Sequence, residues 1–235
     1  MTGTSGQRIK QLDILRFFAV FLVLGRHMVI CPPETSVAFN FITTIWQRAG
    51  WSGVDLFFVL SGFLVSGLIF REFKESGTVR LGRFLVRRGF KIYPSFWLLI
   101  VATYLYSQLR GLEFSIDGFW SEILFIQNYN FQLWNHTWSL AVEEHFYLFL
   151  ALVTFTLLKT KLKEPLSSLP KIFAFAALAC FLMRFYMSLT YQYDFYEYFA
   201  PSHLRFDSLF FGVAIAYFWH FEDLGSHLVL EKYRK

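Results

Sequence analysis

The sequence predicts an all-α membrane protein, a polytopic transmembrane helix bundle with about six spans. Three observations predict this fold class. Of the 235 residues, 55% are hydrophobic and 17% are charged, whereas a soluble domain carries roughly 25% charged residues. Several stretches are apolar and approach the roughly 20 residues that a helix needs to cross a bilayer. Basic residues gather in alternate loops, which is the pattern that sets membrane orientation.

The same composition excludes other classes of protein. A disordered chain needs low hydrophobicity and high charge, and this chain has neither. The two cysteines, Cys31 and Cys180, are too few for a disulfide scaffold. The net charge of +5 is compatible with nucleic-acid binding only where basic residues lie on a soluble surface. We therefore expect the lipid bilayer as a partner and no nucleic acid.

The predicted spans form a single membrane domain over residues 1–235 without an internal repeat. They cover residues 12–30, 51–70, 90–107, 138–158, 172–189 and 204–221. The apolar stretch 119–125 is too short to cross a bilayer, so we expect it in an outer loop. The first span contains Asp13 and Arg16 and lacks a small-residue cleavage site after it, so it is not a cleavable signal.

The basic residues assign the two sides of the membrane. Most of the 22 Lys and Arg residues fall in loops on the side of the N-terminus, while Arg48, Arg110 and Arg205 fall on the other side. The side rich in basic loop residues is cytoplasmic. Both termini are therefore predicted to be cytoplasmic. The chain is predicted to be a multi-pass protein of the cell membrane, which is the inner membrane in a bacterium.

Ionisable side chains stand inside the first two spans, where each costs roughly 2.5–3.5 kcal/mol on insertion scales and so suggests a function. Arg16 and His27 are about three helical turns, or roughly 16 Å, apart on one face. Snorkelling of Arg16 to headgroups and an interhelical hydrogen bond of His27 are the structural alternatives. Asp55, in the second span, needs a partner or a water-filled cavity.

Acidic residues also open the fourth span. Glu143 and Glu144 point about 100° apart, so at most one faces a given cavity. Ser139, Glu143 and Tyr147 form a stripe at helical i, i+4 spacing. Anchoring of the aromatic residues at the membrane interface is an alternative that leaves the acids unexplained.

The last two spans carry further charges. Arg184 lies inside the fifth span, and Arg205 and Asp207 open the sixth. A pair between Arg205 and Asp207 is the structural alternative to a role in substrate binding. His136 and His145 lack metal-ligand spacing, so we expect no metal.

Five motifs, in this order, resemble the acyltransferase 3 family of membrane O-acyltransferases. They are LDILR at 12–16 followed by His27, GVDLFFVLSG at 53–62, RRGFKIYP at 87–94, WSLAVEEHFY at 138–147 and RFDSLFFG at 205–212. The resemblance implies transfer of an acyl group, usually acetyl, from cytoplasmic acyl-CoA to a hydroxyl of a glycan or similar acceptor. It also implies that Arg16 and His27 belong to the active site.

The chain departs from the family pattern in three respects. Lys91 stands where the family has an Arg, which loses bidentate geometry, and His145 replaces a Gln. Family members usually have more spans than this chain has room for. We therefore expect a fragment, a shortened relative or an incomplete product, or a partner chain that supplies the missing helices.

These observations give a hypothesis with three groups of residues. Cations near the cytoplasmic face bind the phosphates of the acyl-CoA (acetyl-CoA) donor, and His27 acts as general base near neutral pH. The catalytic group is His27, Arg16, Glu143 and Asp55; the donor-binding group is Arg16, Arg87, Arg88 and Lys91; the acceptor-binding group is Trp138, Ser139, Arg205 and Asp207. Two alternatives stay open, a proton-linked small-solute transporter and a non-catalytic membrane subunit.

Overall fold

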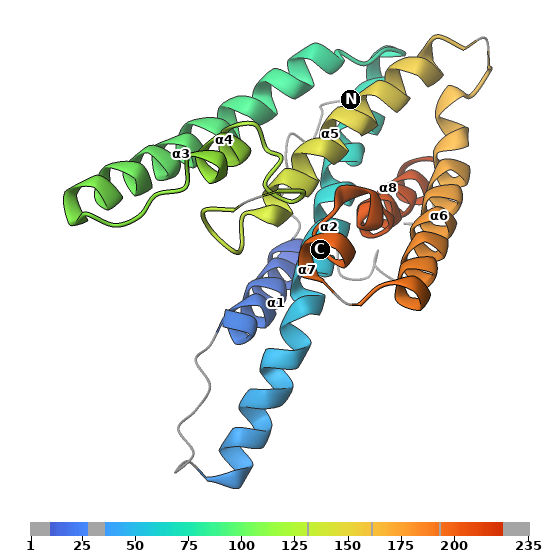
Figure 1. Cartoon of the computed structure of the whole chain (residues 1–235). Helices are drawn as coiled ribbons and strands as arrows, with labels where there is room; N and C mark the ends of the chain where they lie inside the picture. Colours follow the sequence, from blue (N-terminus) through green and yellow to red (C-terminus); the bar gives the residue numbers. More distant parts are fainter. Residues whose placement is uncertain (1–9, 28–35, 131, 161, 193, 223–235) are drawn as a thin grey trace.

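A computed structural model describes residues 10–27, 36–130, 132–160, 162–192 and 194–222. All regular elements in these ranges are helices, which confirms the predicted all-α fold class (Figure 1). They are α1 (Lys10–His27), α2 (Val37–Ser76), α3 (Leu81–Arg110), α4 (Ile116–Ile123), α5 (Trp138–Leu158), η1 (Pro165–Ser168), α6 (Leu169–Thr190), α7 (Phe195–Tyr198), η2 (Ser202–Leu204) and α8 (Phe206–Phe221).

Three helical stretches of the described chain are long and apolar enough to cross a membrane. They are α2, α5 and the continuous stretch Pro165–Thr190, which joins η1 to α6. The apolar helix α8 is shorter. Helices occupy the described part of all six predicted spans; residues 28–30, the end of the first predicted span, lie outside the described residues. The number of spans and the cytoplasmic position of the termini stay predictions.

The helix boundaries follow local capping chemistry. α5 coincides with the predicted span 138–158, but α2 extends well beyond the predicted 51–70. The Ser36 side chain accepts a hydrogen bond from the backbone N–H of Phe39 at 3.3 Å and so caps the N-terminus of α2. Gly77, with a φ of 70°, closes its other end. At 1.5 Å per residue, α2 is about 60 Å long, roughly twice the thickness of the hydrocarbon core.

Glycines let α2 contact its two neighbours closely. A Cβ added at Gly53 would lie 2.7 Å from the backbone oxygen of Ala19 in α1. On the other side, Gly62 faces the backbone oxygen of Leu209, and Gly212 of α8 faces that of Val59. Small residues at membrane helix crossings permit this approach.

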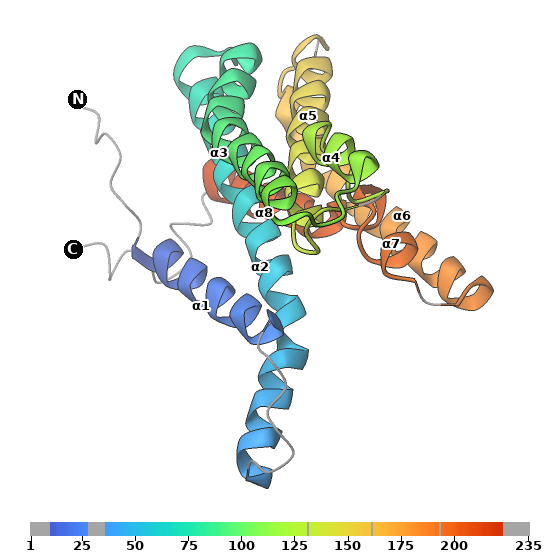
Figure 2. The ribbon, with the colours of Figure 1, turned by 60° about the vertical axis from the view of Figure 1, so that its left-hand side comes forward.

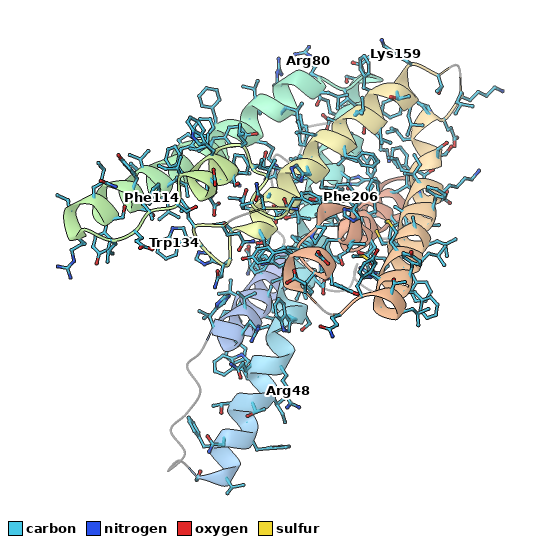
Figure 3. All side chains as sticks on the ribbon, in the orientation of Figure 1. Arg48, Arg80, Phe114, Trp134, Lys159 and Phe206 are labelled. Carbon is cyan, nitrogen blue, oxygen red and sulfur yellow. The ribbon has the colours of Figure 1, made fainter. Side chains whose placement is uncertain are left out.

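α2 is the central element of the bundle. The main buried cluster joins Phe58 of α2, Phe146 of α5 and Phe210 of α8. Figure 2 shows α1 and α6 projecting on opposite sides of α2. In Figure 3, Arg80 and Lys159 lie at one end of the molecule and Arg48 lies at the opposite end, an arrangement compatible with the two predicted membrane sides.

Candidate active site

A cavity of about 690 Å³ lies between the C-terminal end of α1, the middle of α2 and the segment that precedes α5. His27 and Arg26 of α1 line it, together with Ser139 and the buried Trp138 of α5. His27, Trp138 and Ser139 are three of the predicted site residues. The cavity has the volume typical of small-molecule sites.

His136, which the sequence hypothesis did not include, faces His27 across this cavity. The centroids of the two rings are 6.2 Å apart and the ring planes meet at 80°. Burial lowers the pKa of His136, and the nearby His27 lowers it further. A lowered pKa keeps His136 neutral near pH 7, so that its ring can both donate and accept a hydrogen bond.

A buried carboxylate in α4 fixes the segment that carries His136. Glu122 is fully buried, and its Oε1 accepts hydrogen bonds from Thr137 Oγ1 at 2.7 Å and from the backbone N–H of Leu133 at 3.0 Å. Burial raises the pKa of Glu122, and the hydrogen bonds from Thr137 and Leu133 oppose that rise. The segment is also tied to α3, since Trp134 Nε1 donates to Thr103 Oγ1 at 3.1 Å.

The cavity contains polar atoms that the protein leaves unsatisfied. Both the Oε1 and the Nε2 of Gln132 are buried without a hydrogen-bond partner, and Gln132 lines the cavity. Buried amides are normally hydrogen-bonded. Arg26, also in the lining, places its guanidinium 4.4 Å from the ring centroid of Trp51. The site therefore offers an amide and a cation to a polar ligand.

Two ion pairs lie at the start of α8. Arg205 pairs with Asp55 of α2 at 2.5 Å, and Ser208 Oγ donates to the same carboxylate oxygen at 2.9 Å. Asp207 pairs with Arg184 of α6 at 2.5 Å. The Arg205–Asp207 pair that the sequence left open is therefore replaced by two pairs to other helices.

The Arg205 pair is joined to the cavity through aromatic rings. The guanidinium of Arg205 lies 4.4 Å from the Phe199 ring and 5.8 Å from the Trp138 ring. Trp138 in turn lines the cavity. Asp55 and Arg205 thus support a wall of the site, and the contacts of the Asp55 carboxylate are with Arg205 and Ser208.

A second polar cluster lies between α3 and α5. Tyr147 donates a hydrogen bond to Glu143 at 2.5 Å, which joins two of the three residues of the predicted stripe, and Tyr93 donates to Glu144 at 2.9 Å. The Arg88 guanidinium lies 4.3 Å from the Tyr147 ring centroid and attracts Glu143. Glu143 therefore faces Arg88 of α3, and it is also hydrogen-bonded by Tyr147 of α5 and by Ser61 of α2.

The other predicted donor-binding cations are exposed. Arg87 and Lys91 lie on the surface of α3. Arg16 pairs with Asp13 at 3.0 Å, and 47% of its side chain is accessible. Within the described residues, no group of three or more His, Cys, Asp or Glu could hold a metal ion.

Comparison with known proteins adds to this geometry. The family model described as "Acyltransferase domain" (Acyl_transf_3) matches residues 9–229. The chain belongs to the acyltransferase 3 family. All the predicted site residues of this acyltransferase 3 chain lie within the matched range.

Curated relatives of this acyltransferase 3 chain come from bacteria. It is 28% identical over 191 residues to "Putative O-acetyltransferase" of Staphylococcus aureus (strain COL), which covers 74% of this chain and 31% of the relative. It is 28% identical over 164 residues to "Peptidoglycan O-acetyltransferase OatA" of Listeria monocytogenes, covering 63% and 24%. "O-acetyltransferase OatA" of Staphylococcus aureus (strain NCTC 8325) is 26% identical, with 88% and 34% covered.

The chain thus spans about a third or less of the length of these relatives. No solved structure is significantly similar to it. Family membership assigns the chain to the acyltransferases and favours this class over a transporter.

Proposed function

We propose that this chain forms the transfer site of an integral-membrane O-acetyltransferase. It would move an acetyl group from cytoplasmic acetyl-CoA to a hydroxyl of a cell-envelope glycan, as a multi-pass protein of the cell membrane. The observation that carries this proposal is the His27–His136 pair in a cavity between α1, α2 and α5. The family match and the names of the relatives support the reaction class.

In the proposed reaction, His27 removes the proton from the acceptor hydroxyl. The oxygen attacks the thioester carbonyl, so that a C–O bond forms and the C–S bond breaks. The proton then passes from His27 to the departing thiolate of CoA. Arg26, a cation in the same cavity, stabilises the negative charge that develops on the carbonyl oxygen.

The donor would approach from the cytoplasmic side. Arg87 and Lys91 are exposed on α3 and bind the CoA phosphates, for which Arg and Lys are well suited. Arg88 lies deeper, with its buried Nε lacking a partner, so it can contact the donor inside the bundle. Arg16 supplies a further cation near the same side.

The test is reconstitution of the full chain in vesicles with radiolabelled acetyl-CoA and a soluble peptidoglycan disaccharide. The proposal predicts that label moves to the disaccharide. Binding of acetyl-CoA without transfer would instead support a non-catalytic subunit. Flux of a small solute that does not depend on the disaccharide would support a transporter.

A further inference from the structure

A second cavity, of about 590 Å³, lies beside the C-terminal end of α6, next to α7 and η2. Aromatic side chains dominate its lining. Tyr129, Tyr186, Tyr191 and Tyr196 line it, together with His203 and Glu197.

One wall of this cavity is held rigidly. The rings of Tyr129 and His203 stack with centroids 5.7 Å apart and planes 12° from parallel. The Tyr129 hydroxyl and His203 Nδ1 also form a hydrogen bond of 3.0 Å. The wall therefore presents a flat aromatic face in a defined orientation. Tyr191, by contrast, is 58% exposed, so its ring is free to pack on a ligand.

Tyr196 connects this second cavity with the first one. It lines both cavities, although the second is built from α6, α7 and η2 and the first contains His27. The two cavities are therefore neighbours that share one side chain, an arrangement that suits an elongated substrate.

The chemistry of the lining favours the glycan acceptor over the acetyl-CoA donor. Among the described residues that line the second cavity, none is Lys or Arg, and Glu197 would repel the phosphates of a CoA donor. A sugar unit, however, has apolar C–H faces that pack on aromatic rings. Its hydroxyls hydrogen-bond to a carboxylate or a phenol.

We propose that the second cavity binds the acceptor glycan and holds the sugar unit next to the one that is acetylated at His27. This inference rests on the proposed acyl transfer, since it says where the acceptor of that reaction binds. Tyr191 and Tyr196 stack on the sugar, and Glu197 binds its hydroxyls.

The experiment measures binding directly, without the need for turnover. The full chain in lipid nanodiscs is titrated with the soluble β-1,4-linked disaccharide of N-acetylglucosamine and N-acetylmuramic acid. Tyr191→Ala and Glu197→Gln are each expected to weaken binding roughly tenfold. Tyr191→Phe retains the ring and should retain the affinity, while Tyr106→Ala, an exposed tyrosine of α3, is the matched control.

The outcomes separate this inference from the proposed reaction. Equal affinity of the wild type and of both cavity variants for the disaccharide would overturn the inference. The tyrosines of the cavity would then serve only to anchor the chain at the membrane interface. Absence of disaccharide binding to the wild type would also overturn it. Binding that depends on the cavity, without acetyl transfer in the vesicle assay, would overturn the proposed function alone.

Discussion

The imidazole rings of His27 and His136 face each other across one cavity, with 6.2 Å between their centroids. The first ring comes from the C-terminal end of α1 and the second from the segment before α5. A hydroxyl placed between them meets a candidate base and a neutral hydrogen-bonding partner. This arrangement leads to predictions for the pair and for the contacts that hold it.

The first prediction concerns the pKa of His136. Burial is the larger cause of its lowered pKa, and the nearby His27 is the second. His27→Ala removes only the second cause, so the pKa of His136 should rise but stay below its ordinary value. A histidine-resolved NMR titration of the protein in nanodiscs measures this. A pKa of His136 that does not move would show that the two rings do not interact in the membrane.

The second prediction concerns Glu122. Glu122→Ala leaves Thr137 Oγ1 and the backbone N–H of Leu133 without their acceptor, and each lost hydrogen bond to a charged group costs about 1.5–3 kcal/mol. We expect lower thermal stability. We also expect faster amide hydrogen exchange at residues 132–137, measured by mass spectrometry. Glu113→Ala, in the loop before α4, is the control and should leave exchange in this segment unchanged. Wild-type protection in Glu122→Ala would contradict the positioning role.

The positions of the helices could be predicted from the sequence where they depend on a local run of apolar residues. The span 138–158 coincides with α5, since its apolar run begins at Trp138 and ends before Lys159. The extra length of α2 was missed because Gln47 and Arg48 lower the hydropathy of a stretch that still forms helix. A hydropathy pattern detects insertion into the membrane, whereas helix formation depends on propensity and capping.

The partners of the charged residues could not be predicted, because pairing is a tertiary property. Asp55 and Arg205 are separated by 150 residues in sequence, and no periodicity links them. His136 was missed because it precedes the span and lacks metal-ligand spacing. Its position two residues before Trp138 and three before Ser139, both predicted to bind the acceptor, was the available signal.

The third prediction concerns the Asp55–Arg205 pair. Only 9% of the Arg205 side chain is exposed, against 41% of Asp55, so removal of Asp55 leaves a buried guanidinium without its ionic partner. Asp55→Ala should therefore lower the melting temperature in detergent. The double variant Asp55→Ala, Arg205→Met should recover part of the loss, because it leaves no unpaired buried charge. A double variant that is less stable than Asp55→Ala would argue against this account.

The fourth prediction concerns the crossing of α2 and α8. Gly62 faces the backbone oxygen of Leu209 too closely for any Cβ, so Gly62→Ala must separate the two helices. We expect a clear fall in the melting temperature. Gly82→Ala is the matched control, since a Cβ there meets nothing within 4 Å, and a helical Gly to Ala change is favourable by roughly 1 kcal/mol. Equal melting temperatures for the two variants would contradict the close crossing.

The most direct test of the central claim is the rate of acetyl transfer by His27→Ala. General-base assistance contributes about 10²–10⁴-fold, so the rate in vesicles should fall by at least about 100-fold at equal protein abundance. His220→Gln, a change in α8 outside the cavity lining, should transfer acetyl at the wild-type rate. A wild-type rate in His27→Ala would contradict the assignment of this cavity as the transfer site.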